Sequence, residues 1–353
     1  MNKERIDKLC GEKTLKVVEA MEKIDTNAHG LIFILDENKL IGVVSDGDIR
    51  RWLIKTGDLQ AEIKQFMNLS PMYFSSHDRK NALKIMKSKK IHVAPIVDDK
   101  MHIVDIILDD ELVEAPKDMT LENVPVVIMA GGKGTRLYPY TKILPKPLIP
   151  IGDVPILERI INRFCDFGVR EYYMTVNYKK GMIRSYFSEL QPEYTIEYIE
   201  EDKPLGTGGS IKLIKKEFDC PIIITNCDIL IEANYADIYR YHKASGNQMT
   251  IVSALKNVVV PYGVLKTAEN GVITAMEEKP KLSYFVNTGM YIVDAEMLGK
   301  IPEDTFFHMT DLADMLMKEG LQVGMYPISE ESFLDMGEFE EMRRMEEKLN
   351  IKE

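Results

Sequence analysis

The chain has 353 residues, of which 45% are apolar, and carries a formal net charge of −11. This length favours two domains, and the negative charge argues against non-specific binding to nucleic acid or to a membrane surface. Any anionic substrate must therefore meet a local basic site. The four cysteines show no CxxC spacing and the six histidines form no cluster with them, so a zinc site is not expected.

The start of the chain shows no targeting or membrane segment. Residues 1–7 are charged, unlike a signal peptide, and no apolar run approaches the roughly 20 residues of a membrane-spanning helix. Because the cysteine spacing gives no sign of a disulfide framework, the pattern predicts a reduced, cytoplasmic setting.

Residues 1–118 contain an internal repeat, with copies at about 1–58 and 59–118. The segment LDENKLIGVVSDGD (residues 35–48) aligns without a gap with VDDKMHIVDIILDD (residues 97–110). Each copy is predicted to form a helix, two apolar strands joined by a turn, and a second helix. A unit of this size buries little core alone, so the two copies are expected to pack together.

This repeat resembles a tandem pair of CBS domains, and GVVSDGDIRR (residues 42–51) is similar to the end of a first CBS copy. In many such domains a Ser or Thr and an Asp three residues later contact the ribose and phosphate of an adenine nucleotide. The resemblance implies that Ser45 and Asp48 bind an AMP- or ATP-type ligand. The second copy has Ile107 and Asp110 there, so at most one nucleotide site is expected. A module that only dimerises or supports the neighbouring domain is the alternative.

A polar segment with one proline, EAPKDMTLEN (residues 114–123), is predicted to link this module to the rest of the chain. Its length permits the two halves either to dock or to move. Residues 124–353 are predicted to form the second domain. CBS pairs often associate face to face, so the resemblance also implies a homo-oligomer.

A glycine-rich loop follows the first apolar run of the second domain, residues 124–129. Glycine lets backbone N–H groups approach phosphate oxygens closely, so a strand that ends in such a loop is typical of a nucleotide-phosphate site. The spacing is neither that of a Walker A loop nor that of the dinucleotide fingerprint. The candidate nucleotide-binding residues here are Ala130, Gly131, Gly132, Gly134 and Thr135.

Two candidate catalytic cations follow this loop. Arg136 can fork two phosphate oxygens and always stays charged, which suits the β and γ phosphates of a triphosphate. Lys146 lies between Pro145 and Pro147, and both prolines restrict the backbone around it. A lysine held in this way is predicted to meet a phosphate group at a fixed position.

The stretch GGKGTRLYPYTKILPKPLIPIGDVPIL (residues 131–157) resembles the signature of the sugar-1-phosphate nucleotidyltransferases. This family joins a nucleoside triphosphate to a sugar 1-phosphate and releases pyrophosphate. The resemblance implies an α/β fold with a Rossmann-like, mixed and mainly parallel sheet, and a site at the carboxyl ends of its strands. Apolar spacing predicts an amphipathic helix over residues 156–168, followed by the second strand over residues 171–176.

Residues 203–210 (KPLGTGGS) resemble the family's second glycine loop, which implies that Gly206 and Thr207 lie against the nucleobase. Three shorter motifs around YGV, EKP and VNTG resemble the segments of the sugar site. By this resemblance Glu278 accepts hydrogen bonds from sugar hydroxyls, and Lys279 meets the sugar phosphate. The implied sugar-phosphate residues are Gly263, Glu278, Lys279 and Asn287.

Two carboxylates are predicted to hold Mg²⁺. Asp228 ends the apolar strand PIIITNCD, and a carboxylate at this end of a strand is a typical Mg²⁺ ligand. Asp335, in FLDMGEFEE (residues 333–341), rests on the resemblance to the family's second metal-binding segment. Cys227 stands where the family usually has glycine, and no paired histidine is evident, so it is interpreted as a buried small residue.

These parts favour one reaction. A sugar phosphate oxygen is already a good nucleophile, so the difficulty is to bring two polyanions together. Mg²⁺ with Arg136, Lys146 and Lys279 would offset that repulsion and hold an in-line attack on the α-phosphorus. The fusion of a CBS pair to this domain resembles bacterial enzymes that form GDP-sugars for surface glycans or nonulosonic acids. GTP and glucosamine 1-phosphate are therefore the favoured substrates.

Three alternatives stay open on the sequence. The enzyme could use UTP, dTTP, ATP or CTP with the same glycine loop. The chain could instead be a CBS-based adenine-nucleotide sensor with a lapsed transferase domain, although Arg136, Lys146, Asp228 and Asp335 together count against a lapsed site. A cytidylyltransferase that acts on phosphocholine is the third alternative, and the sugar motifs count against it.

Overall fold

The computed structural model describes residues 3–27, 29–75, 79–108 and 118–349. The chain divides into two compact units. The first unit consists of residues 1–116, 255–284 and 329–331. The second unit contains the remaining residues. Within the described ranges, no helix combines the length and the apolar character that crossing a bilayer needs.

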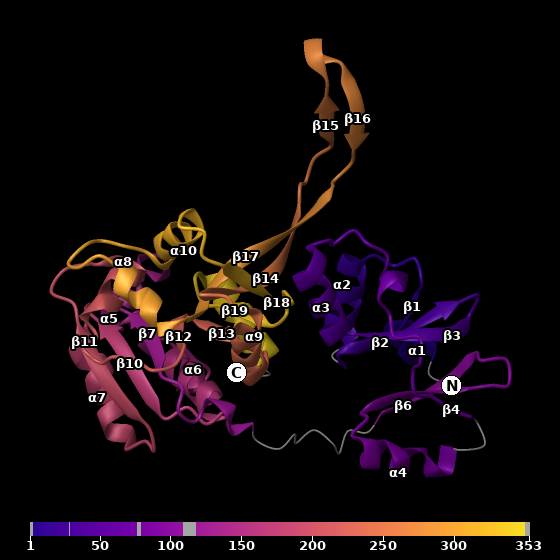
Figure 1. Ribbon diagram of the computed structural model, residues 1–353, viewed down its shortest axis with the longest axis horizontal. Coiled ribbons are helices and arrows are strands. Elements are labelled where there is room, and N and C mark those ends of the chain that lie inside the picture. Colours follow the sequence, from indigo (N-terminus) through magenta and orange to yellow (C-terminus); the bar gives the residue numbers. More distant parts are fainter. Residues whose placement is uncertain (1–2, 28, 76–78, 109–117, 350–353) are drawn as a thin grey trace. The chain divides into compact units, whose positions relative to one another are not determined.

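The N-terminal module repeats one arrangement of helices and strands, drawn in indigo to purple in Figure 1. The first copy contains α1 (Lys3–Leu9), β1 (Cys10–Glu12), α2 (Val17–Asn27), β2 (Leu31–Asp36), β3 (Lys39–Ser45) and α3 (Asp46–Thr56). The second contains β4 (Phe74–Ser75), α4 (Arg79–Lys89), β5 (Val93–Val97) and β6 (Ile103–Leu108). The helix predicted at the end of the second copy, and with it Asp110, falls outside the described residues.

The two copies share one hydrophobic core. Phe33 of β2 and Leu40 of β3 are buried together with Val93 of β5 and Ile106 of β6. Each copy forms a three-stranded sheet in which its second and third strands are antiparallel. The prediction that the copies pack together is confirmed, because a single sheet with so few strands could not cover these apolar side chains.

The second unit is built on a seven-stranded sheet with the order β11–β10–β7–β12–β17–β14–β18. Its strands are β7 (Val126–Ala130), β10 (Glu171–Val176), β11 (Thr195–Glu200), β12 (Ile222–Asn226), β14 (Met249–Val259), β17 (Lys281–Val293) and β18 (Val323–Ile328). Neighbours among β11, β10, β7 and β12 run parallel, as do β14 and β18, whereas β17 is antiparallel to β12. The predicted mixed and mainly parallel α/β sheet is confirmed.

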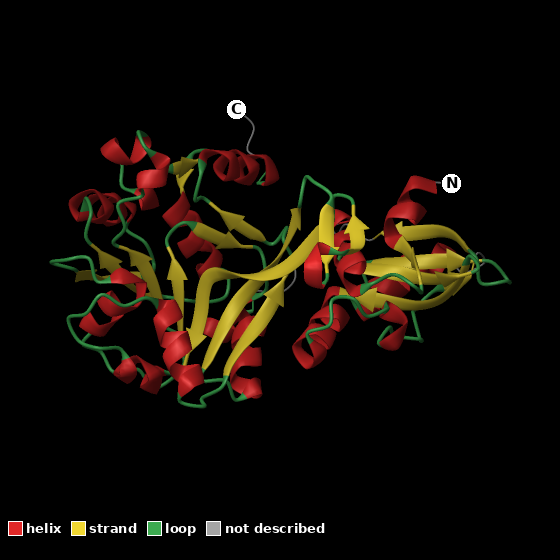
Figure 2. Ribbon diagram, turned by 90° about the horizontal axis from the view of Figure 1, so that it is seen from above, coloured by secondary structure: helices red, strands yellow, loops and turns green. Residues whose placement is uncertain are grey.

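Helices cover both faces of this sheet (Figure 2). Alternate residues of β7 enter two different cores: Val126 packs in one, with the apolar face of α6, and Val127 packs in the other, with α10. Because successive strand residues point to opposite faces, a central strand of this kind must be apolar throughout. The helices are α6 (Ile156–Cys165), α7 (Lys180–Leu190), α9 (Tyr235–Ser245), α10 (Met309–Lys318) and α11 (Phe339–Lys348).

Residues 118–123 differ from the linker expected there. Leu121 is fully buried in the core beside α6, and its N–H donates to the carbonyl of Phe167 at 3.1 Å. Arg240 of α9 donates to Asp118 Oδ2 from both terminal nitrogens at 3.0 Å. Gly168, which ends the predicted helix, has φ +96° and leaves room for this segment. The residues just before β7 are therefore fixed to the second unit.

Short elements complete the second unit. They are α5 (Tyr140–Ile143), β8 (Pro150–Ile151), β9 (Val154–Pro155), α8 (Gly206–Gly209), β13 (Ile229–Ile231) and β19 (Phe333–Asp335). In residues 255–284, which group with the first unit, β15 (Val264–Thr267) pairs with β16 (Ile273–Glu277) as an antiparallel hairpin.

Candidate active site

A cavity of about 440 Å³ opens at the carboxyl ends of four parallel strands. Thr175 and Asn226 come from the ends of β10 and β12, and Glu201 directly follows β11. Ligand sites of open α/β sheets form at this end of the strands. Among the predicted site residues, the cavity is lined by Gly131, Gly132, Gly134, Thr135, Arg136, Lys146, Gly206, Thr207 and Asp228. Ala130 is buried just below, at the end of β7.

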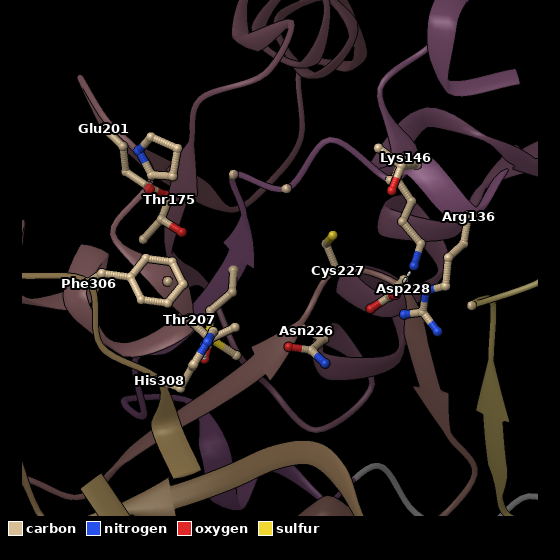
Figure 3. Close-up of a pocket in the computed structure, with 18 residues that line it drawn as sticks. Arg136, Lys146, Thr175, Glu201, Thr207, Asn226, Cys227, Asp228, Phe306 and His308 are labelled. Atoms are coloured by element: carbon tan, nitrogen blue, oxygen red, sulfur yellow. Dashed lines mark hydrogen bonds and ion pairs between the residues drawn. The ribbon is translucent and has the colours of Figure 1, made fainter. Parts of the chain in front are cut away.

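The cavity has two chemically different ends (Figure 3). Lys146, Arg136 and Asp228 gather at one side of the view, whereas Glu201, Thr175 and Phe306 gather at the other. A long pocket with cations at one end and a carboxylate at the other matches the charge pattern of a nucleotide, with phosphates at one end and base N–H groups at the other.

The cationic end is organised around a buried ion pair. Lys146 Nζ donates to Asp228 Oδ2, and the two side chains are only 11% and 14% exposed. Lys146 reaches this position from a tight turn that follows Pro145. Gly134 has φ +63°, and a Cβ on it would stand 3.0 Å from Lys146 Cβ. Glycine is needed here by the backbone and by the close approach of Lys146.

Asp335 lies beside Asp228 because two short strands pair. β13 begins directly after Asp228 and is antiparallel to β19, with Ile229 opposite Asp335. The N–H of Met336 donates to the carbonyl of Asp228 at 2.8 Å. Two carboxylates that are far apart in the sequence are therefore brought together, and Asp228 also forms the ion pair with Lys146.

Arg136 reaches the same place. A Cβ built on Gly337 would stand 3.1 Å from Asp335 Oδ2 and 3.4 Å from Arg136 Nη1, so the carboxylate and the guanidinium flank this glycine. Burial, followed by the negative charge of Asp228, raises the pKa of Asp335, although Lys146 and Arg136 oppose this shift. A divalent cation fits this donor set, because two adjacent carboxylates with like charge gain from a shared counter-ion.

Cys227 lines the cavity next to Asp228 but is buried. Burial, followed by the charge of Asp228, raises the pKa of its thiol to about 12. A thiol with such a pKa is not a nucleophile at neutral pH. The interpretation of Cys227 as a buried small residue is confirmed.

Glu201 is the carboxylate among the lining residues that sequence reasoning missed. It is buried, its Oε2 accepts from the N–H of Leu205 at 3.3 Å, and a Cβ on Gly131 would stand 2.4 Å from Oε1. Burial raises the pKa of this carboxyl group. The signal that pointed to Asp228, a carboxylate at the end of a strand, was present here too, because the alternation of TIEYIE (residues 195–200) is typical of a half-exposed strand.

The second glycine loop makes room for a neighbouring chain segment. Gly206 has φ +77°, and a Cβ on it would stand 2.6 Å from the carbonyl oxygen of Phe307. The N–H groups of Gly208 and Gly209 both donate to that oxygen, at 2.8 and 3.0 Å. Thr207 Oγ1 accepts from the N–H of Met309 at 3.1 Å. These glycines therefore hold the wall of the cavity that carries Phe306.

The predicted sugar-phosphate residues are not among the residues that line this cavity. Gly263 and Glu278 lie on the exposed hairpin, where a Cβ on Gly263 would stand 2.9 Å from Glu278 Oε2. Lys279 follows with φ +48°. Asn287 is exposed at the surface, and its Nδ2 donates to the hydroxyl of Tyr291 at 2.9 Å. Their roles at the sugar stay predictions.

In the N-terminal module, Ser45 and Asp48 bind each other. Ser45 Oγ donates to Asp48 Oδ2 at 2.6 Å, and the N–H of Asp48 donates back to Ser45 Oγ at 3.2 Å. The N–H of Ser45 also donates to Asp48 Oδ2, which completes a capping box at the start of α3. Their spacing thus has a local structural reason, and nucleotide binding by this pair stays a prediction.

Comparison with known proteins agrees with this geometry. Residues 125–351 match the nucleotidyl transferase family, and residues 12–55 and 63–118 match the CBS domain. A mannose-1-phosphate guanyltransferase of Debaryomyces hansenii is 33% identical over 184 residues, 50% of this chain and 51% of the relative. A UTP–glucose-1-phosphate uridylyltransferase of Synechocystis is 32% identical over 215 residues, 55% of each chain. The chain spans about half the length of the curated relatives it matches.

Among solved structures, HddC from Yersinia pseudotuberculosis is similar, with 27% identity and a TM-score of 0.50. The match covers 64% of this chain and 99% of HddC. The family match extends over most of the chain and contains every residue of the cavity described above. The chain therefore belongs to the nucleotidyl transferase family and carries a tandem pair of CBS domains ahead of its transferase domain.

Proposed function

We propose that this protein transfers a nucleoside monophosphate from GTP to a hexose or hexosamine 1-phosphate and releases pyrophosphate. The observation that carries the proposal is the cavity itself. Lys146 and Arg136 stand beside two carboxylates at one end, and the buried Glu201 stands at the other. A pocket with these two ends would bind a nucleoside triphosphate in one orientation, with the phosphates beside the cations and the base beside Glu201.

The phosphate end supplies what the transfer needs. The glycine loop would offer backbone N–H groups to the triphosphate, and Arg136 would fork oxygens of the departing pyrophosphate. Lys146 would meet the α-phosphate, where negative charge builds as the sugar phosphate oxygen attacks in line. Asp228 and Asp335 would hold Mg²⁺, which supplies charge neutralisation when bound. No general base is required, because the attacking phosphate oxygen is already ionised.

The base end favours guanine. A carboxylate accepts two hydrogen bonds from the adjacent N1–H and N2–H groups of guanine, and the Watson–Crick edges of adenine, uracil and cytosine offer no such adjacent pair. The Glu201 carboxylate is buried and accepts from the Leu205 N–H, so a base without a donor here would leave its charge only partly compensated. The relatives named mannose-1-phosphate guanyltransferase point to the same nucleotide.

The acceptor is the less constrained substrate. We propose glucosamine 1-phosphate, for the synthesis of bacterial surface glycans or nonulosonic acids. Mannose 1-phosphate and glucose 1-phosphate, which occur in the names of the relatives, are the alternatives to test beside it. Glu278 and Lys279 are proposed to contact this substrate.

The test is pyrophosphate release with Mg²⁺, using GTP, UTP, dTTP, ATP and CTP against a panel of hexose and hexosamine 1-phosphates. We expect release with GTP and one such sugar phosphate, and none when either substrate is omitted. Lys142→Ala, which removes an exposed lysine close to Lys146, serves as the matched control. Pyrophosphate release that needs phosphocholine, or no release from folded protein with any pair of substrates in the panel, would contradict the proposal.

A further inference from the structure

The Lys146–Asp228 ion pair occupies an oxygen that a metal ion would need. Lys146 Nζ binds Asp228 Oδ2 directly, and both side chains are almost completely buried. A divalent cation that binds Asp228 would meet this ammonium charge at close range, in a site where water screens little of the repulsion. The protein therefore offers Asp228 a counter-ion of its own.

The protein supplies few other metal ligands at this place. Among the described residues, no group of three or more His, Cys, Asp or Glu side chains is arranged to hold a metal ion. Asp228 and Asp335 are the two carboxylates that the pairing of β13 with β19 brings together. Mg²⁺ is commonly held by one or two carboxylates together with substrate phosphates and water. The site becomes complete only when phosphate oxygens join it.

Lys146 is built to change partners without moving the backbone. Its backbone lies between two prolines in a tight turn, and the start of its side chain packs against Gly134, so the Cα position is fixed. Its side chain is a flexible four-carbon stem with a compact charge at the end. The ammonium group can therefore swing from Asp228 to a phosphate oxygen while the turn stays in place.

We infer that Lys146 acts as a gate on the metal site, which blocks a divalent cation until a nucleoside triphosphate draws the ammonium group away. This inference rests on the proposed function, because it assumes that the cavity receives a triphosphate. Binding of the nucleotide transfers Lys146 to the α-phosphate and frees Asp228. Asp228 and Asp335 would then be free to hold a divalent cation beside the phosphates, so metal and nucleotide would strengthen each other's binding.

The experiment measures binding of Mn²⁺ to the full chain by electron paramagnetic resonance, with no sugar phosphate present. In the wild type we expect Mn²⁺ alone to bind at least about tenfold more weakly than Mn²⁺ with a non-hydrolysable GTP analogue, after correction for binding by the free analogue. Lys146→Met removes the charge and keeps much of the side chain's bulk. This variant is expected to bind Mn²⁺ alone about tenfold or more tightly than the wild type.

Three controls make the result specific. Lys142→Met removes a nearby exposed charge and should leave Mn²⁺ binding as in the wild type. Lys146→Arg keeps a cation and should keep the site closed. Asp228→Asn should lose Mn²⁺ binding with and without the analogue.

The gate is overturned if Lys146→Met binds Mn²⁺ no better than Lys142→Met, a comparison that needs no nucleotide. It is also overturned if wild-type protein that binds the analogue binds Mn²⁺ no more tightly with it than alone. Because the readout is metal binding, the gate can fail while pyrophosphate release succeeds. It can also hold when no tested sugar phosphate reacts.

Discussion

Replacement of Glu201 by glutamine tests how the cavity chooses its base. The substitution keeps the size of the side chain but turns one acceptor into an N–H donor, which would face a donor of guanine. A hydrogen bond to a charged acceptor contributes about 1.5–3 kcal/mol, and the loss of one such bond corresponds to roughly a ten- to hundredfold decrease. We therefore expect Glu201→Gln to lower kcat/KM for GTP by this factor, with a smaller effect on UTP and ATP.

The assay is pyrophosphate release at saturating sugar 1-phosphate, with each nucleoside triphosphate varied in turn. Glu200→Gln is the matched control, because this neighbouring residue is exposed and pairs with Lys180 and Arg184 at the surface. Burial raises the pKa of Glu201. The preference for GTP over the other triphosphates should therefore weaken as pH falls through that raised pKa, because protonation removes the charged acceptor. Equal losses for GTP and UTP, or equal effects of Glu200→Gln and Glu201→Gln, would refute the assignment.

Three further changes have defined outcomes. Lys146→Ala should lower turnover by roughly 10²-fold or more in the pyrophosphate assay, and a near-normal rate would contradict its place at the α-phosphate. Gly206→Ala should lower the free energy of unfolding, measured by urea titration, by about 2–5 kcal/mol, because of its positive φ and the clash of the new Cβ with Phe307. The control Gly132→Ala, whose Cβ would meet no atom within 4 Å, should change it by less than about 0.5 kcal/mol. Asp335→Asn should abolish transfer yet raise the melting temperature at neutral pH, because an ionised carboxylate whose pKa is raised in the folded state opposes folding. The gain in melting temperature should shrink as pH falls through that raised pKa and vanish below about pH 4.

Much of the fold could be predicted because its signals are local. The two CBS copies keep their alignment, and α4 (Arg79–Lys89) occupies the repeat position of α2 (Val17–Asn27). The helix from Ile156 and the strand Glu171–Val176 follow from apolar periodicity. Leu121 was misplaced in a linker, because its burial depends on contacts with Phe167 and α9 that lie far away in the sequence.

The candidate site was predictable in part for the same reason. The glycine loop, Arg136 and Lys146 form one continuous motif, whereas the approach of Asp335 to Asp228 depends on the pairing of β13 with β19. The collision of a Cβ at Gly131 with Glu201 could not be foreseen, because it arises only when the ends of β7 and β11 are placed beside the same cavity.

The central claim is tested most directly by following GTP, Mg²⁺ and glucosamine 1-phosphate, then mannose 1-phosphate, with ³¹P nuclear magnetic resonance. We predict that GTP and one sugar phosphate disappear together, while a GDP-sugar and pyrophosphate appear in equal amounts. Release of inorganic phosphate and GDP, without a sugar nucleotide, would show attack at the γ-phosphorus instead. That result would contradict the assignment of Lys146 to the α-phosphate and the proposed transfer.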